Sequence, residues 1–394
     1  MGNILSKKNV SSHSLDEKDW ELYNDNLNSF NSFKIPKIFD EKNKHDYLFI
    51  ALADGTENDL KDPKRYTNVA KLHEELRDNK NINIKFEYVT GVGTYEGKGN
   101  IIDKTMAKVD AAFSFSHKKR VERLYKSFSK QANIWKSNDP KANISIVEVG
   151  FSRGSGVIAL LNQMIHEKGI KDTINKVWKD GEKVLTGDYL IKPGQTPQAV
   201  LLYDPVTTYM KENFSLSNST ISALQINANN EYRDLFPLSH IAQGKNQLQI
   251  SLPGCHTDIG GGYDKNGLSF YSKNIANQYL NKMINTKELL FKKTRLPSKD
   301  DPSIVIHHSE EHNILYKKEE QRGVIFMDKN QYDLKTKSLN ISSLDKSNFF
   351  YRSNSMNNKI KEFKNQRLKQ LNSQNKQLNK NEISKNIDLE KSIF

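Results

Sequence analysis

Hydrophobic positions along the chain fall into five short runs that predict β-strands. The first run, residues 47–53, is continuously apolar, as in a strand covered on both faces, whereas residues 82–88 alternate apolar with polar positions. Apolar residues at helical spacing follow residue 154 and stop at Gly169. Strands that alternate with helices indicate an α/β protein with a mostly parallel sheet flanked by helices. The other predicted strands are residues 144–149, 199–203 and 248–252.

Polarity divides the chain into three predicted regions. Residues 1–40 are expected to form a polar N-terminal extension that could contain one short helix. Residues 41–316 form the predicted α/β domain, and residues 317–394 are rich in Lys and Asn. The last region is expected to be partly helical or disordered. Its sequence suggests a weakly amphipathic helix with a basic face. The two interpretations are a solvated tail and a segment that touches anionic lipid. The apolar positions of that helix are Ile360, Phe363, Leu368 and Leu371.

Composition and charge exclude several classes of protein for this chain. The 394 residues carry a net charge of +13, which favours anionic partners without naming one. A single cysteine, Cys255, excludes an intramolecular disulfide and a cysteine-based zinc site. No run of about 18 apolar residues is present, so we expect no membrane span. The polar start of the chain does not resemble a secretory signal peptide.

A candidate nucleophile lies in the motif G-x-S-x-G, formed by Gly150, Ser152 and Gly154. A predicted strand enters this motif and a predicted helix leaves it, which is the context of a nucleophile elbow. Small residues are needed at positions 150 and 154 because the backbone turns sharply there. The helix that follows would help to stabilise negative charge on a substrate.

A serine nucleophile needs a base, and the base needs a carboxylate that orients it. Asp204 follows the strand 199–203, and His256 follows the strand 248–252. This is the chain order Ser, Asp, His of α/β-hydrolases, with all three residues at one edge of a parallel sheet. Alternatives stay open at this point. The competing bases are His307, His308 and His312, and Asp258 competes with Asp204 as the carboxylate.

Four segments of the chain carry a resemblance to a known family. The most specific is the decapeptide 254–263, which resembles the signature G-x-H-[ST]-D-[IV]-G-G-G-Y of type VI secretion phospholipase effectors, first lipase-effector family. Residues 53–58 resemble the D-G-T-x-N turn of that family, residues 88–94 its Y-x-x-G-x-G-T stretch, and residues 230–237 its E-x-R-x-x-F segment. The resemblance spans roughly residues 46–263.

The resemblance implies an α/β-hydrolase fold, a Ser-His-Asp triad and esterase action on membrane phospholipids. Carried over by position, it assigns the nucleophile to Ser152, the carboxylate to Asp204 and the base to His256. It therefore favours His256 over His308.

The backbone N–H of Arg153, directly after the nucleophile, is the first predicted oxyanion donor. The second is expected from Gly55 or Thr56 in the loop after the first strand, with the alternative that Asp54 only braces the loops of Ser152 and His256. Glycines 260–262 would let the backbone pass close to the elbow or to a lipid headgroup, or would form a tight turn before a helix.

These observations predict a serine esterase that hydrolyses acyl esters of membrane glycerophospholipids. We expect no cofactor, no nucleic-acid partner and no metal, although Asp258 and Asp264 beside glycines are the nearest approach to a Ca²⁺ pattern. Residues 170–198 and 206–225 are candidate lids or membrane-docking elements. The alternatives are a hydrolase of soluble esters or thioesters and a catalytically idle lipid-binding or protein-binding domain.

The expected location follows from the same resemblance. The chain would be made in the cytoplasm and exported to a target cell by a dedicated secretion system, to act at membranes. Its expected partners are a phospholipid surface, a component of the secretion machine and an immunity protein.

Overall fold

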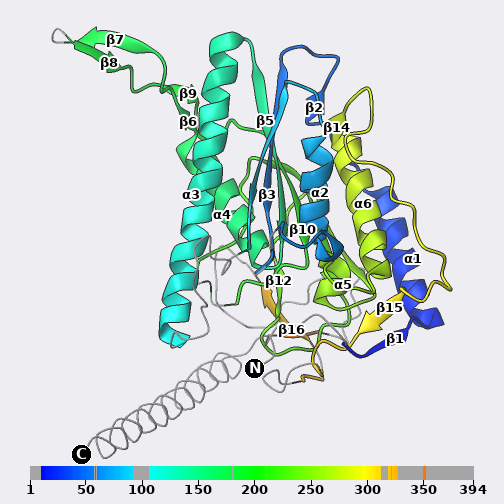
Figure 1. Cartoon of the computed structure of the whole chain (residues 1–394). Coiled ribbons are helices and arrows are strands. Elements are labelled where there is room, and N and C mark those ends of the chain that lie inside the picture. The colour runs from blue at the N-terminus through cyan, green and yellow to red at the C-terminus, as the bar shows by residue number, and fades with distance from the viewer. Residues whose placement is uncertain are drawn as a thin grey trace, which may run out of the picture.

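The computed structural model describes residues 10–56, 58, 60–91, 106–179, 182–208, 210, 212–311, 318–320, 322–326 and 349–351 (Figure 1). The helices are α1 (Glu17–Ser32), α2 (Asn68–Arg77), α3 (Met106–Asn138), α4 (Arg153–Lys168), α5 (His256–Gly260) and α6 (Gly267–Met283), with a 3-10 turn at Pro63–Arg65. The strands are β1 (Ser12–Ser14), β2 (Phe39–Asp40), β3 (Asp46–Ala53), β4 (Ile84–Val89), β5 (Asn143–Phe151), β6 (Ile170–Lys171), β7 (Lys176–Lys179), β8 (Glu182–Leu185), β9 (Tyr189–Ile191), β10 (Gln198–Tyr203), β11 (Thr220–Ala228), β12 (Leu238–His240), β13 (Gln247–Leu252), β14 (Ile284–Asn285), β15 (Val305–His307), β16 (Arg322–Phe326) and β17 (Phe349–Tyr351).

The centre of the molecule is a six-stranded sheet in the order β13-β11-β10-β5-β3-β4. Every neighbouring pair in this sheet runs parallel, so all six carboxyl ends lie at one edge. Five of the six strands match the predicted runs to within a few residues, and the α/β class is confirmed.

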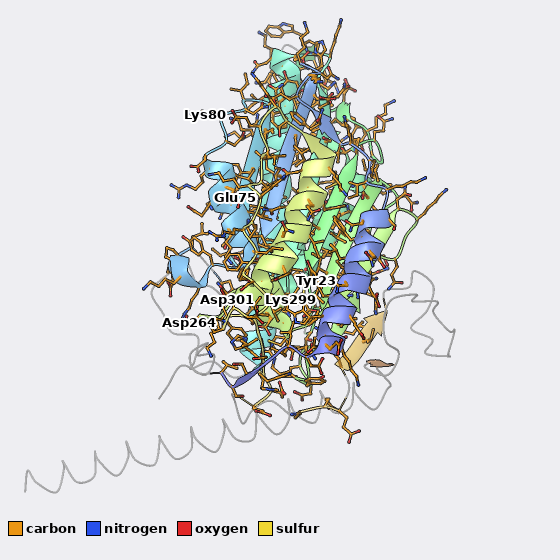
Figure 2. The ribbon with its side chains drawn as sticks, turned by 90° about the vertical axis from the view of Figure 1, so that its right-hand side faces the viewer. Tyr23, Glu75, Lys80, Asp264, Lys299 and Asp301 are labelled. Carbon is orange, nitrogen blue, oxygen red and sulfur yellow. The ribbon has the colours of Figure 1, made fainter. Side chains whose placement is uncertain are left out.

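Helices cover both faces of the sheet, which explains why its central strands are buried on both sides. Helices α3 and α4 pack on one face through residues such as Val121, Leu124 and Val157. Helices α1, α2 and α6 cover the other, and Figure 2 looks directly onto this second layer. Tyr23 of α1 and Tyr271 of α6 meet edge to face with ring centroids 5.2 Å apart, which joins two helices that are distant in the sequence.

Strand β11 is the main departure from the sequence prediction, which placed residues 206–225 in a polar lid or docking segment. Residues 220–225 belong instead to a buried strand between β10 and β13. Its sequence hides this because Gln225 and Asn227 face the interior. The Gln225 amide is satisfied there, since its Oε1 accepts hydrogen bonds from the backbone N–H groups of Ile241 and Ala242 at 3.0 and 3.1 Å.

The insertion 170–198 lies far from the carboxyl edge of the sheet. It follows α4, whose 16 residues span about 24 Å and begin beside Ser152. Figure 1 shows the β7–β8 hairpin projecting from the end of the molecule opposite α5, the helix that begins with His256. The expectation that this segment is a lid over the site is therefore wrong.

Elements from both ends of the described chain are joined to its central part by hydrogen bonds. Strand β1 pairs antiparallel with β15, and the Asn26 side chain of α1 accepts a hydrogen bond from the Ser251 N–H of β13 at 2.9 Å. Strand β16 pairs parallel with β12. The apolar positions predicted between residues 360 and 371 lie outside the described residues. Among the helices of the described ranges, none has the length and apolar character needed to cross a membrane.

Candidate active site

Ser152 occupies a strained turn between β5 and α4. Its backbone has φ 57° and ψ −127°, a conformation that costs energy for a residue with a side chain. A methyl group at Gly150 would lie 2.7 Å from the Cα of Ser155, and one at Gly154 would lie 2.2 Å from the carbonyl oxygen of Ala53. Both positions therefore require glycine, which is the geometry of a nucleophile elbow.

Asp204 and His256 form a buried hydrogen-bonded pair at the same edge of the sheet. The His256 Nδ1 and the Asp204 Oδ2 are 2.6 Å apart, and both side chains are almost fully buried. Asp204 also has a positive φ of 37°, so two of the three non-glycine residues with positive φ in the described chain are predicted site residues. Strained backbone of this kind collects at functional sites.

Backbone and ring contacts place Ser152 beside this pair. The Ser152 N–H donates to the carbonyl oxygen of Tyr203, the residue before Asp204, at 3.0 Å. The ring of Phe151, directly before Ser152, stacks on the His256 imidazole with centroids 4.6 Å apart. The structure thus brings all three predicted residues to one edge, with Asp204 and His256 in direct contact.

The electrostatic environment favours an ionised Asp204 and a neutral His256. Burial by itself would raise the pKa of Asp204, but the Arg322 guanidinium and the hydrogen bond to His256 outweigh it and hold the pKa well below its usual range. Burial lowers the pKa of His256 below 6.5, and the Asp204 contact only partly offsets this. A neutral imidazole whose Nδ1 faces a carboxylate can accept a proton at its Nε2.

Two charged groups next to the pair were not predicted from the sequence as site residues. Arg322 of β16 donates from both terminal nitrogens to the Asp204 carboxylate, at 2.7 Å each. Glu231 accepts the His256 N–H at 3.2 Å and is itself paired with Arg233 at 2.7 Å. Glu231 and Arg233 belong to the E-x-R-x-x-F segment, so the family motif was a signal. Nothing in the pattern near residue 322 marks Arg322.

The competing histidines and carboxylate have other partners. Asp258 binds the ring of His307, with 2.6 Å between its Oδ1 and the His307 Nδ1, so it forms a second buried pair separate from His256. The His308 Nε2 lies 2.9 Å from the His13 Nδ1. His312 lies outside the described residues. Among these candidates, Asp204 and His256 are the pair that contact each other beside Ser152, and their catalytic roles stay a prediction.

The loop after β3 lies against the elbow, where a second oxyanion donor is expected. The close approach of Gly154 to Ala53 and of Gly55 to Phe151 brings the loop to the start of α4. Arg153 is the first residue of α4, and the first N–H groups of a helix lack intrahelical partners.

Within this loop the two candidate donors differ. The Gly55 N–H donates to the Asp54 Oδ1 at 2.7 Å, whereas the Thr56 hydroxyl is buried without a hydrogen-bond partner. The other oxygen of Asp54 accepts from the hydroxyls of Thr67 and Tyr88. Asp54 thus braces its own loop, and the Gly55 N–H is already used there. The unpaired group of Thr56 is its side-chain hydroxyl, whereas the role predicted from the sequence belongs to the backbone N–H of Gly55 or Thr56 and stays a prediction.

The glycines at 260–262 serve close packing. A methyl group at Gly260 would lie 2.0 Å from the Phe151 ring, so the backbone passes directly over the elbow residue. Gly261 has φ 83° and lies against the start of α2. The sequence expectation that this segment approaches the elbow is confirmed for Gly260.

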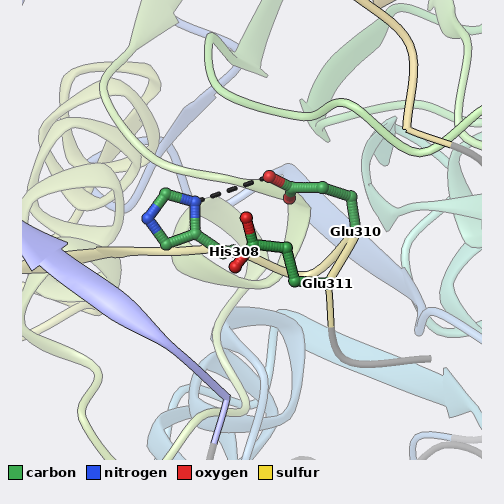
Figure 3. Close-up of side chains that lie close together, drawn as sticks. All are labelled: His308, Glu310 and Glu311. Atoms are coloured by element: carbon green, nitrogen blue, oxygen red, sulfur yellow. Dashed lines mark ion pairs between the residues drawn. The ribbon is translucent and has the colours of Figure 1, made fainter. Parts of the chain in front are cut away.

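The candidate Ca²⁺ residues are not partners of each other in the contacts described. Asp258 binds His307, and Asp264 pairs with Arg65 at 3.1 Å. In the described ranges, one group has the spacing of metal ligands, His308, Glu310 and Glu311 (Figure 3). The Lys318 ammonium already lies 3.4 Å from a carboxylate oxygen of each glutamate, so a cation is supplied by the chain itself.

The fold is that of an α/β-hydrolase. It has a parallel sheet, a strained elbow directly after β5, and the predicted residues Asp204 and His256 at the carboxyl edge of the sheet. Residues 48–189 match the family model described as "T6SS, Phospholipase effector Tle1-like, catalytic domain", which supports the family resemblance over that range. The motif segments 230–237 and 254–263 lie outside the match. The matched range includes Ser152 and the loop after β3, whereas Asp204 and His256 lie beyond it. Among curated protein sequences, none matches this chain.

The solved structures that this chain matches include the Tle1 effector bound to the VgrG spike from the type 6 secretion system. That protein shares 19% identity with this chain at a TM-score of 0.38, over 58% of this chain and 52% of its own length. This chain therefore spans about half the length of that effector. Esterase PE8 shares 11% identity at a TM-score of 0.29, over 64% of this chain and 99% of its own. Est1E from Butyrivibrio proteoclasticus shares 10% at a TM-score of 0.27, over 62% and 91%.

Proposed function

We propose that this chain is a serine esterase of the phospholipase type, with Ser152 as nucleophile, His256 as base and Asp204 as the carboxylate that orients it. The observation that carries the proposal is the buried Asp204–His256 pair, 2.6 Å between oxygen and nitrogen, at the edge where Ser152 sits in its strained turn. A phospholipid acyl ester is the proposed substrate, which rests on the family description matched by residues 48–189.

The proposed reaction has two stages that balance in protons. The His256 Nε2 takes the proton of the Ser152 hydroxyl while its Oγ attacks the ester carbonyl carbon, and the same proton then passes to the leaving alcohol oxygen. The Arg153 N–H and a donor from the Thr56 region would hold the oxyanion. Water then attacks the acyl-enzyme with His256 again as base, and Ser152 regains its proton as the fatty acid leaves.

The charge of the chain supports a bilayer as the place of action. A net charge of +13 would attract the protein to anionic lipid and raise its local concentration there. We propose export by a type VI secretion machine, with a spike component as carrier and an immunity protein as antagonist. The family description supports the type VI route but names neither a carrier nor an antagonist. Loss of export when the machine's genes are deleted is the result that checks the route.

Product analysis on mixed phosphatidylethanolamine and phosphatidylglycerol vesicles tests the activity. Mass spectrometry should detect free fatty acid and lysophospholipid with the wild type and neither with Ser152→Ala or His256→Ala. Asp204→Asn should lower kcat on the order of 10³-fold or more, because the imidazole loses its orienting carboxylate.

Asp258→Asn is the matched control, because Asp258 also holds a buried histidine at 2.6 Å yet is not part of the proposed triad. Folded Asp258→Asn protein should keep its turnover. An inactive Asp258→Asn beside an active Asp204→Asn would reverse the assignment of the carboxylate. Turnover of short soluble esters without any vesicle hydrolysis would favour a soluble-ester hydrolase, and a biological effect that survives Ser152→Ala would favour a binding domain.

A further inference from the structure

Among the described residues, Arg322 is one of the largest fully buried side chains, and its guanidinium contacts the candidate active site. It begins β16, far beyond the region of the chain that carries the recognised motifs, and its side chain is 1% exposed. Its guanidinium donates to both oxygens of Asp204, to the carbonyl oxygen of Ala228 at 2.8 Å and to that of Phe236 at 3.0 Å. The backbone carbonyls hold the guanidinium in place while its fork faces the carboxylate.

Each oxygen of the Asp204 carboxylate has two contacts, and together they fix the orientation of the side chain. The Oδ1 accepts from Arg322 and from the Ala228 N–H at 2.8 Å, and the Oδ2 accepts from Arg322 and faces the His256 Nδ1. A planar two-point contact of this kind fixes the plane of a carboxylate, which a lysine with its single ammonium does not do. The oxygen that orients the imidazole therefore cannot rotate away.

Arg322 also supplies the charge that a buried carboxylate requires. Asp204 is fully buried, so without a cation it would tend to bind a proton and lose its attraction for an imidazolium. Other charged or titratable groups face this cluster. They are His256 of α5, His240 of β12, and the Glu231–Arg233 pair, in which the two charges largely cancel.

We propose that Arg322 is a positioning residue for ester hydrolysis. By holding Asp204 in one orientation, strand β16 completes a site whose three proposed triad residues follow β5, follow β10 and begin α5. The proposal rests on the function proposed above. It assigns a role in the reaction to the C-terminal part of the chain, which the sequence pattern separates from the α/β domain. Arg322 acts through Asp204 and touches no reacting atom.

The test compares wild type with Arg322→Gln and Arg322→Lys, using Arg77→Gln as control for loss of an exposed arginine ion pair. Two readouts are taken between pH 5 and 9: hydrolysis of a short-chain ester, and the labelling rate of Ser152 by a fluorophosphonate. Circular dichroism shows whether each variant is folded. We expect Arg322→Gln to lose about 10²-fold in kcat with little change in KM, because misplacement near 1 Å costs this much.

The pH profile separates positioning from a merely structural role. Without Arg322 the pKa of Asp204 rises, since its burial remains and its cation is gone, so the acid limb of kcat and of labelling should move to higher pH. Arg322→Lys should recover part of the shift through its charge, but not the full rate. It also provides the comparison if Arg322→Gln does not fold.

Three results decide the proposal. Folded Arg322→Gln, or Arg322→Lys if only that variant folds, with the rate and pH profile of the wild type would overturn the role of Arg322 and leave the esterase proposal standing. Wild-type protein that neither reacts with the probe nor hydrolyses any ester would instead remove the proposed function. A common drop at all pH values, equal in kcat and in folded fraction, would reduce Arg322 to a stabilising residue and also overturn the proposal.

Discussion

Adding one methyl group at Gly154 should disable the elbow, whereas the same change two residues later should be tolerated. In Gly154→Ala the new carbon would lie 2.2 Å from the carbonyl oxygen of Ala53 and 2.6 Å from that of Asp54, both backbone atoms. Relief to an ordinary contact of 3.4 Å requires a shift of about 1.2 Å between α4 and the end of β3. This shift would separate Ser152 and Arg153 from the loop that carries Thr56.

The expected magnitudes follow from that displacement. Overpacking of this kind costs about 1–3 kcal/mol, and the gain of roughly 1 kcal/mol from replacing glycine in a helix offsets only part of it. A misplacement near 1 Å in a catalytic group lowers kcat by about 10²-fold. In Gly156→Ala the atoms nearest to the new carbon are the flexible end of Met210, at 2.8 Å, and the Phe214 ring edge, at 3.3 Å. Met210 can move aside, so stability should change by less than about 1 kcal/mol.

Urea unfolding and kcat on a short-chain ester, corrected by titrating active Ser152 with a fluorophosphonate, provide the measurement. The expected pattern is a large loss of kcat in folded Gly154→Ala and a change of at most a few-fold in Gly156→Ala. Equal kcat in both variants would refute the reasoning, because it would mean that the contact between α4 and β3 does not set the position of Ser152.

Two further predictions concern protons. Burial raises the pKa of Glu148 from 4.5 to about 8, so the folded protein keeps a proton there that the unfolded chain releases, and stability falls as pH rises from 4.5 to 8. Glu148→Gln should remove this loss, which is on the order of 4 kcal/mol between pH 5 and pH 8 at about 1.4 kcal/mol per pH unit. Urea unfolding at these two pH values measures it, with Glu122→Gln as the exposed control. A difference from wild type that does not grow with pH would contradict the assignment. Because burial lowers the pKa of His256 from 6.5, the acid limb of kcat/KM should have its midpoint below pH 6.5, and a midpoint above 7 would contradict a neutral, buried base.

Local patterns in the sequence were sufficient for five of the six central strands, for the elbow and for the chain order of the candidate residues. The continuous apolar run before Asp54 reflects burial of a strand on both faces. The strand that leads into Gly150 and Ser152 reflects a sharp turn. Both requirements are local. The positions of Asp204 and His256 followed because the carboxyl ends of parallel strands share one edge of a sheet. Their contact at 2.6 Å agrees with that expectation.

Three features depended on the tertiary structure. Strand β11 looked polar because Gln225 and Asn227 find their hydrogen-bond partners inside the fold. Asp258 could be assigned to His307 only once β15 was placed beside α5. No local sequence pattern points to Arg322, because its partner is the Asp204 carboxylate, 118 residues earlier in the chain. Periodicity records whether a position faces water or the interior, but which buried charge meets which is decided only when distant segments pack together.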